Sequence, residues 1–254
     1  MAQKNETKTV IITGGTKGIG ADIARKFHQE GWFVVVASRK SSDLLNELSA
    51  NISYQVMDVQ NEADHIRVVA ETQKLTGRLD CYINCAGFSK WVPIAAVDDR
   101  FWNQMIDTNL KGTFWGCKTA AKSLAVDGSI INVSSLAGKR GSANNSVYCA
   151  TKFGANGLTQ ALAKELGPKG IRVNAVCPVY ISTEGLIEAL EEPNAPPNGQ
   201  KVDTYLENFT KQNTALQRLP KAKEVADLCY YLASSQASAI TGQCINVDCG
   251  VMPQ

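Results

Sequence analysis

Short apolar runs rich in β-branched residues alternate along the chain with longer stretches in which apolar residues recur at helical spacing. Strands are expected at 9–13, 32–37, 52–57, 79–84, 129–133, 171–176 and 244–247. Helices are expected at 21–30, 62–75, 99–126, 147–166 and 221–234, and the long 99–126 stretch should break in two near Asn109. This alternation predicts an α/β fold in which helices cover both faces of a parallel sheet.

The segment 183–213 departs from this alternation. Its run from Glu191 to Gly199 contains three prolines and cannot continue one helix, because proline lacks the backbone N–H and clashes with the preceding turn. An insert of this length in a compact domain is typically a lid or a binding loop, although its polar composition also permits a disordered excursion. We therefore expect a single domain over 1–254, with 183–213 as a substrate-loop insert.

A glycine-rich turn follows the first strand and reads Gly14-Gly15-Thr16-Lys17-Gly18-Ile19-Gly20 before the helical pattern begins. Glycines at this spacing allow a tight turn and let the backbone approach a pyrophosphate, which the N-terminus of the next helix faces. A plain turn with several glycines is the alternative. The order of strand, glycine turn and helix favours a dinucleotide site.

The end of the second strand indicates which dinucleotide is bound. Ser38, Arg39 and Lys40 follow the apolar run, and no acid appears until Asp43. Sites for NAD carry an acidic residue here, which accepts from the ribose 2′-hydroxyl, whereas a cation and a hydroxyl suit a 2′-phosphate. Arg39, Ser38 and Lys17 therefore favour NADP(H). The alternative is that both cations are ordinary solvated side chains.

A second group of chemically informative residues lies around the fifth strand. Ser134 and Ser135 directly follow the predicted strand 129–133. Tyr148 and Lys152 are four residues apart, so they lie on one face of the predicted helix. An ammonium beside a phenol stabilises the phenolate and should lower the tyrosine pKa, which makes it a usable acid or base. Alone, the pair could equally be a half-buried tyrosine and a solvated lysine.

Composition excludes several other classes of protein. The net charge is +2 with 20% charged residues, so nothing indicates a nucleic-acid or membrane partner. No apolar run reaches about 18 residues, and the first eight residues lack the apolar core of a signal peptide. The eight cysteines are scattered, which suits buried thiols in a cytoplasmic protein, and the two histidines, His28 and His65, lie in polar helical contexts. Neither a metal site nor a histidine triad is expected.

These features together resemble the classical short-chain dehydrogenases/reductases over essentially the full chain. The matching residues are Thr13-Gly14-x-x-x-Gly18-x-Gly20, Asp58, Asn84-Cys85-Ala86-Gly87, Asn109, Ser135, Tyr148-x-x-x-Lys152, Pro178 and Thr183. Ser135, not Ser134, keeps the family's spacing to the tyrosine. The chain departs from the family pattern at Cys85, where a second asparagine is usual, and at Val179 and Cys249, where glycine is usual.

The resemblance implies a Rossmann fold with strand order 3-2-1-4-5-6-7 and a homotetramer or homodimer built on the long crossover helices. In the implied mechanism, NADPH delivers hydride to a carbonyl carbon and Tyr148 protonates the oxygen. Ser135 would hydrogen-bond that oxygen. Lys152 would hold the nicotinamide ribose, and Asn109 would organise a water that leads to it. The implied cofactor contacts are Gly14, Thr16, Lys17, Gly18, Ile19, Gly20, Ser38, Arg39, Asp58, Val59, Asn84, Ala86, Gly87, Tyr148, Lys152, Pro178, Ile181 and Thr183.

The implied activity is an NADP(H)-dependent interconversion of a carbonyl and a secondary alcohol. Candidate substrate contacts are Phe88, Ser89, 136–145, Val179, Tyr180 and the insert; the small polar stretch 142–146 favours a small polar metabolite. A 3-oxoacyl-acyl-carrier-protein-type reductase is an alternative, although 125–127 lacks the basic residue common in that group. A non-catalytic NADP-binding redox sensor is another alternative. A purely structural module is disfavoured by the intact Tyr-Lys pair.

Overall fold

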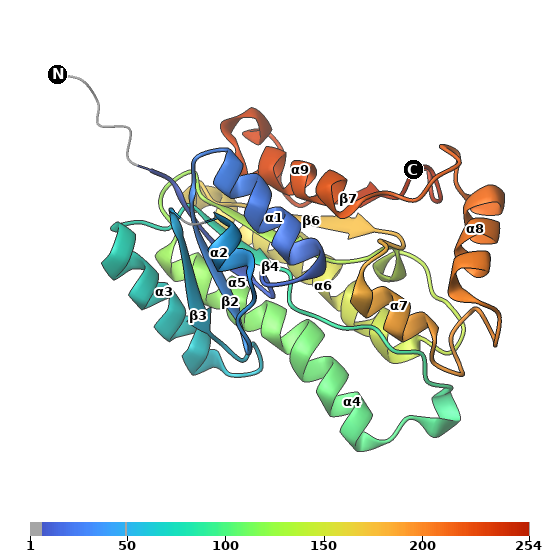
Figure 1. The fold of residues 1–254 in the computed structure, drawn as a ribbon. Helices are drawn as coiled ribbons and strands as arrows, with labels where there is room; N and C mark the ends of the chain where they lie inside the picture. Colours follow the sequence, from blue (N-terminus) through green and yellow to red (C-terminus); the bar gives the residue numbers. More distant parts are fainter. Residues whose placement is uncertain (1–6, 49, 254) are drawn as a thin grey trace.

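The computed structural model describes residues 7–48 and 50–253. Seven parallel strands form one sheet in the order β3-β2-β1-β4-β5-β6-β7, which confirms the expected fold and strand order (Figure 1). The strands are β1 (Thr9–Thr13), β2 (Phe33–Ser38), β3 (Ile52–Val56), β4 (Cys81–Asn84), β5 (Ser129–Val133), β6 (Arg172–Pro178) and β7 (Cys244–Val247). Every predicted strand is present, because each is a short apolar run bounded by polar residues or glycine.

Helices cover both faces of the sheet. The helices are α1 (Gly18–Gln29), α2 (Leu44–Leu48), α3 (Glu62–Thr76), α4 (Asp99–Ile106), α5 (Gly112–Ser123), α6 (Ser146–Leu166), α7 (Glu184–Leu190), α8 (Val202–Asn213) and α9 (Ala222–Ala233). Successive residues of β1 contribute to opposite layers. Val10 and Ile12 pack in the layer of α1 and α9, whereas Ile11 packs in the layer of α3, α5 and α6. All three are fully buried, so β1 is the centre of the core.

The break expected near Asn109 is a turn of π-helix. Helix α4 ends at Ile106, the π turn covers Asp107–Lys111, and α5 begins at Gly112. A π turn inserts an extra residue into the helix and is frequent at functional sites. Helix α5 ends at Ser123, earlier than expected, because Leu124 is already extended (ψ 143°), and the chain then turns through Asp127, whose φ is 65°.

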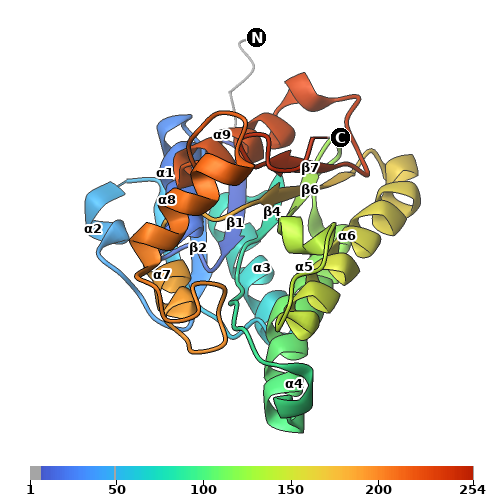
Figure 2. The ribbon, with the colours of Figure 1, turned by 90° about the vertical axis from the view of Figure 1, so that its right-hand side faces the viewer.

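The insert is ordered as two helices, α7 and α8, joined by the proline-containing stretch 191–201, so the prediction that it is not one helix is confirmed. Ala189, Leu190 and Leu206 of the insert form a small hydrophobic cluster with the buried Trp91, which lies outside the insert. Figure 1 shows α7 and α8 beyond the carboxyl ends of the strands, and Figure 2, viewed from that end, shows them next to each other in front of the sheet. The insert therefore consists of two helices that pack against Trp91.

One histidine lies in an environment that the sequence did not indicate. His65 was expected in a polar helical context, yet it is fully buried, with Nδ1 2.8 Å from the Tyr82 hydroxyl and Nε2 2.9 Å from the Val59 carbonyl. Burial lowers the pKa of His65, so the ring is held neutral with both nitrogens satisfied. The eight cysteines are free thiols, and five of them are buried.

Candidate active site at the carboxyl edge of the sheet

The ends of β1 and β4 are joined by one hydroxyl. Thr13 Oγ1, at the last position of β1, accepts the N–H groups of Cys85 (3.0 Å) and Ala86 (3.2 Å). Gly14 follows with φ +67°, and a Cβ there would lie 2.8 Å from Ala86 Cα. The two chain segments therefore meet without intervening side chains. Thr13 was matched as part of the glycine motif but not expected as a site residue; a hydroxyl at the end of a central strand was the available signal.

The glycine turn forms a backbone cradle at the start of α1. A Cβ at Gly20 would overlap the Gly14 carbonyl, so only glycine lets the helix approach the turn this closely. The N-cap residue Lys17 gives α1 no side-chain cap within the described residues, which leaves the first-turn N–H groups available to an anion. This arrangement fits the pyrophosphate of a dinucleotide.

The two cations expected at the cofactor's phosphate, Arg39 after β2 and Lys17 in the glycine turn, have different surroundings. Arg39 is exposed and forms no ion pair with any residue in the described part of the chain. Lys17 lies 3.8 Å from Glu184 at the start of α7, and both side chains are exposed. Beside them, Thr16 Oγ1 donates to Ser38 Oγ over 3.1 Å. Two paired hydroxyls, followed in the chain by the exposed Arg39, therefore lie where a ribose phosphate is expected.

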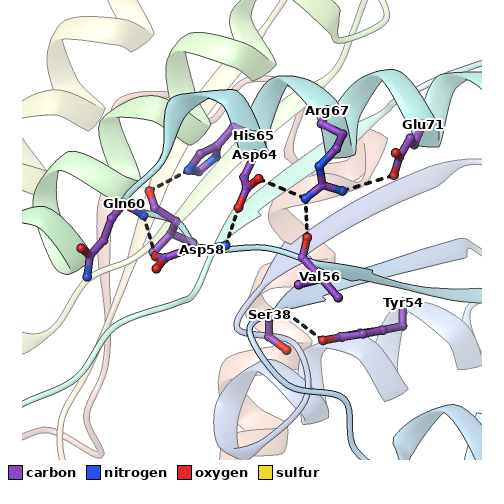
Figure 3. A network of polar contacts seen from close by, with 10 residues as sticks. Ser38, Tyr54, Val56, Asp58, Gln60, Asp64, His65, Arg67 and Glu71 are labelled. Atoms are coloured by element: carbon purple, nitrogen blue, oxygen red, sulfur yellow. Dashed lines mark hydrogen bonds and ion pairs between the residues drawn. The ribbon is translucent and has the colours of Figure 1, made fainter.

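Asp58 follows β3 and is held by its own loop (Figure 3). Its backbone N–H donates to Asp64 Oδ2 over 2.8 Å, and its Oδ1 accepts the Gln60 N–H over 3.0 Å. Arg67 bridges Asp64 (3.2 Å) and the Val56 carbonyl (2.5 Å), which fixes the start of α3 against the end of β3. The Asp58 carboxylate is thus set at the carboxyl edge of the sheet by contacts within residues 56–67.

Lys152 lies buried between α6 and the end of β5, with 7% of its surface exposed. Its ammonium donates to the Val133 carbonyl over 2.9 Å and lies 5.6 Å from the centroid of the Tyr148 ring. Burial lowers the pKa of Lys152 to about 8. The Val133 carbonyl is a backbone group, so no sequence pattern could have identified it as the lysine's partner.

The expectation of a lowered tyrosine pKa is wrong for the protein alone. Burial raises the pKa of Tyr148 to about 12, and a hydrogen bond with the Ser135 hydroxyl partly offsets the rise. Removal from water destabilises the phenolate more than its neighbours stabilise it. Ser134 lies on the other side, where its hydroxyl donates to the Lys152 carbonyl over 3.3 Å. Ser135 is therefore the serine whose hydroxyl meets Tyr148.

Asn109, in the π turn, fixes the loop that follows β4. Its Oδ1 accepts the Phe88 N–H over 3.0 Å and its Nδ2 donates to the Phe88 carbonyl over 2.8 Å. A Cβ at Gly87 would lie 3.1 Å from Asn109 Oδ1 and 3.9 Å from Lys152 Nζ. Gly87 thus lets the Lys152 side chain of α6 and the π turn approach one backbone position.

Some expected cofactor contacts direct their side chains elsewhere. Asn84 is buried, donates to Asn132 Oδ1 over 2.9 Å and packs against Gly116 of α5, so its side chain does not face the glycine turn. The Thr183 hydroxyl caps α7 by accepting the Leu186 N–H over 3.3 Å, while its methyl group faces Gly18 of the glycine turn. Ile19, Val59, Pro178 and Ile181 are partly or fully buried in the packing around the site.

The comparisons with known proteins agree with this geometry. A family model described as enoyl-(acyl carrier protein) reductase matches residues 14–252. The chain is 32% identical to a 3-oxoacyl-(acyl-carrier-protein) reductase FabG of Chlamydia muridarum, covering 96% of this chain and 97% of the relative. It is 31% identical to L-2,3-butanediol dehydrogenase of Corynebacterium glutamicum, covering 97% and 99%. The solved structure of an actinorhodin polyketide ketoreductase variant with NADPH superposes with a TM-score of 0.89 at 30% identity, covering 99% of both chains.

This chain belongs to the short-chain dehydrogenase/reductase family. As a member of that family, it is an oxidoreductase that uses a nicotinamide cofactor and a small-molecule substrate. Within the described residues, no helix combines the length and apolar character that crossing a membrane requires.

The buried amine of this short-chain dehydrogenase/reductase predicts a specific pH dependence. The pKa of Lys152 is lowered from 10.5 to about 8 in the folded state, so between these values the unfolded chain binds more protons. The wild type should therefore gain stability as pH rises through this window, by about 3 kcal/mol relative to Lys152→Met. Urea denaturation of both proteins at pH 7 to 11 measures the difference.

The same change at the exposed Lys164, on the same helix, is the matched control and should leave the wild-type pH dependence in place. A constant difference between wild type and Lys152→Met at every pH would contradict the buried-ammonium argument.

Proposed function

We propose that the protein is an NADP(H)-dependent reductase that interconverts a carbonyl and a secondary alcohol on a small polar metabolite. The observation that carries the proposal is the contact of the Ser135 and Tyr148 hydroxyls next to a buried Lys152 ammonium. Two hydroxyl donors at one point suit a carbonyl oxygen that gains negative charge. The bound cofactor supplies the hydride in reduction and accepts it in oxidation.

Each residue of this group has a separate task. Tyr148, with its raised pKa, is protonated at neutral pH and donates its proton to the substrate oxygen in the reducing direction. Ser135 donates to the same oxygen and orients the Tyr148 hydroxyl. Lys152, held by the Val133 carbonyl, provides a positive charge that favours the phenolate left after proton transfer. Asn109 holds the loop at Phe88 against this group.

NADP(H) is the proposed cofactor because the exposed Arg39 directly follows Ser38, whose hydroxyl is paired with that of Thr16, and Arg39 has no acidic partner in the described part of the chain. An exposed guanidinium without a partner can donate two parallel hydrogen bonds to a phosphate, and little is lost because no existing ion pair has to break. An acidic residue, which would repel that phosphate, is absent from the stretch between Ser38 and Lys40. Relatives whose structures hold NADPH or NADP support the proposal.

Reduction of a carrier-bound 3-oxoacyl group is the second candidate, because FabG proteins and a polyketide ketoreductase are among the relatives. The butanediol dehydrogenase, and a neighbouring structure of an aldohexose dehydrogenase, support a small polar substrate instead. The turn before β5 presents the exposed Val126 and no basic side chain to an acidic carrier protein. We therefore favour the small metabolite.

Loss of the Tyr148 hydroxyl tests the chemistry directly. Tyr148→Phe should lower turnover of NADPH with a ketone panel by about a thousandfold or more, because the proton donor is removed while the ring still packs. Binding of NADPH, followed by fluorescence, should change less than threefold. Tyr231→Phe, on the surface of α9, is the control and should keep wild-type turnover.

Retained turnover in Tyr148→Phe would move the proton transfer to another residue. Tight NADPH binding by the wild type, with no turnover of diketones, sugars or acetoacetyl thioesters, would instead favour the redox-sensor alternative. Turnover of acetoacetyl thioesters alone would favour the carrier-bound substrate.

Reversing the charge at Arg39 tests the cofactor choice. Arg39→Asp should weaken NADPH binding by about 30-fold or more and bring NADH affinity to parity or better, because a carboxylate repels a 2′-phosphate and accepts from a 2′-hydroxyl. Calorimetric titration with both cofactors measures the ratio. Lys40→Asp makes the same charge change one residue away and should leave the preference for NADPH in place; equal effects of the two variants would show only a general electrostatic influence.

A second copy of the chain is the proposed partner of the α4, α5 and α6 surface. A hollow of about 440 Å³ there is lined by Ile106, Leu110, Lys111, Phe114, Trp115, Gly154 and Leu158. Phe114 and Phe153 are each nearly half exposed beside it, and such apolar patches mark interaction surfaces. Sedimentation should give a dimer or tetramer that Phe114→Asp dissociates. A monomeric wild type would contradict this assignment.

A further inference from the structure

The loop that carries Asp58 also contacts the π turn that carries Asn109. Gln60 Nε2 donates to the Thr108 hydroxyl over 3.0 Å, and Thr108 is the residue immediately before Asn109. Figure 3 shows the Gln60 side chain pointing away from the Asp64–Arg67 network. Gln60 therefore takes no part in fixing α3 to β3, and its amide is directed to a different element.

The same Gln60 also contacts Asp58, but through its backbone. Its N–H donates to Asp58 Oδ1, whereas its side-chain amide binds Thr108. A substitution of the side chain thus removes the contact to the π turn and keeps the contact to the Asp58 carboxylate. These two interactions can therefore be separated by experiment.

A second contact brings the loop and the π turn together at the backbone. A Cβ at Gly112, the first residue of α5, would lie 3.0 Å from Val59 Cγ2 and 3.1 Å from the Val59 carbonyl. That carbonyl also lies 2.9 Å from Nε2 of the buried His65. The loop is therefore held closely against the end of the π turn. A π turn lacks the regular i to i+4 ladder, so its geometry depends more on such outside contacts.

The π turn in turn determines the position of groups at the catalytic end. Asn109 uses both atoms of its amide on the Phe88 backbone, which fixes Gly87 beside the Lys152 ammonium. A shift of the turn would move Phe88 and Gly87 together, because two hydrogen bonds join them to Asn109. The contacts form a continuous series from the Asp58 loop to Lys152.

We propose that Gln60 is a positioning residue, which holds the π turn through Thr108 and so sets the Asn109–Gly87–Lys152 geometry at the nicotinamide end. The proposal rests on the proposed NADP(H)-dependent function. The family resemblance assigns a role to Asp58 and Asn109 but none to Gln60 or Thr108. Contiguous contacts alone do not demonstrate coupling, so a thermodynamic cycle is the appropriate test.

The experiment compares Gln60→Met, Thr108→Val and the double variant, since each change removes one polar partner at nearly constant volume. Thr108→Ser keeps the hydroxyl and should restore wild-type behaviour. Calorimetry measures the Kd of NADPH and of adenosine 2′,5′-bisphosphate, which lacks the nicotinamide half. Steady-state assays measure kcat and KM on the best ketone.

Each single variant should weaken NADPH binding and lower kcat by about three- to tenfold, the range of one side-chain hydrogen bond. The double variant should be no worse than either single variant. The affinity for adenosine 2′,5′-bisphosphate and the KM of the ketone should stay within twofold of wild type, because Asp58 keeps its backbone contact.

Glu62→Gln is the matched control. It removes the 2.7 Å ion pair with Lys118, which also joins the start of α3 to α5 but does not reach the π turn. This variant should keep wild-type kcat and both Kd values. An equal loss in Glu62→Gln would mean that any loosening of this interface has the same effect, and would overturn the proposal.

Three further results would also overturn it: additive effects of Gln60→Met and Thr108→Val, a parallel loss of affinity for the bisphosphate, or no change in any variant. A wild type that binds NADPH but reduces no carbonyl would contradict the proposed function and not this inference. The Kd values for NADPH of the single and double variants would still test the coupling between Gln60 and Thr108 in that case.

Discussion

The buried ammonium of Lys152 constrains the organisation of this whole edge of the sheet. An amine out of water is costly unless it has a hydrogen-bond acceptor, and here the acceptor is the last carbonyl of β5. The backbone of the same residue is also held, since Ser134 donates to its carbonyl and a Cβ at Gly138 would lie 2.6 Å from that oxygen. Helix α6 is thus fixed to the end of β5 through both the side chain and the backbone carbonyl of Lys152.

This attachment explains why burial has opposite consequences for two residues on one helix. Removal from water disfavours the charged form of each group, so it raises the pKa of Tyr148 and lowers that of Lys152. Both shifts move the groups toward their neutral forms. In the protein alone, the phenol of Tyr148 therefore stays protonated at neutral pH, and Lys152 is the group whose charge is sensitive near pH 8. The proposed role of Tyr148 as the proton donor in reduction agrees with this protonation state.

Features that depend on local pattern could be predicted from the sequence, whereas features that depend on packing between distant elements could not. Strand positions and the Tyr148–Lys152 face follow directly from apolar runs and from helical spacing. The orientation of the Asn84 side chain could not be predicted from the sequence, because it depends on Gly116, a residue of α5 that leaves room for the amide. The burial of His65 depends likewise on Tyr82, from another element. Spacing alone could suggest that a lysine lowers the Tyr148 pKa, but it carries no information on how much water each side chain loses.

The insert is attached to the same edge of the sheet, because the start of its first helix, α7, contacts the glycine turn. The Thr183 methyl carbon would lie 3.4 Å from a Cβ at Gly18, and Glu184 lies near Lys17. At its far side the insert packs on Trp91, in the segment that follows the Asn109-bound loop. The insert is therefore attached both at the glycine turn, where the pyrophosphate is expected, and at Trp91, beyond the loop that Asn109 binds. A displacement of either helix would disturb one of these two contacts, because closely packed side chains leave little room to move.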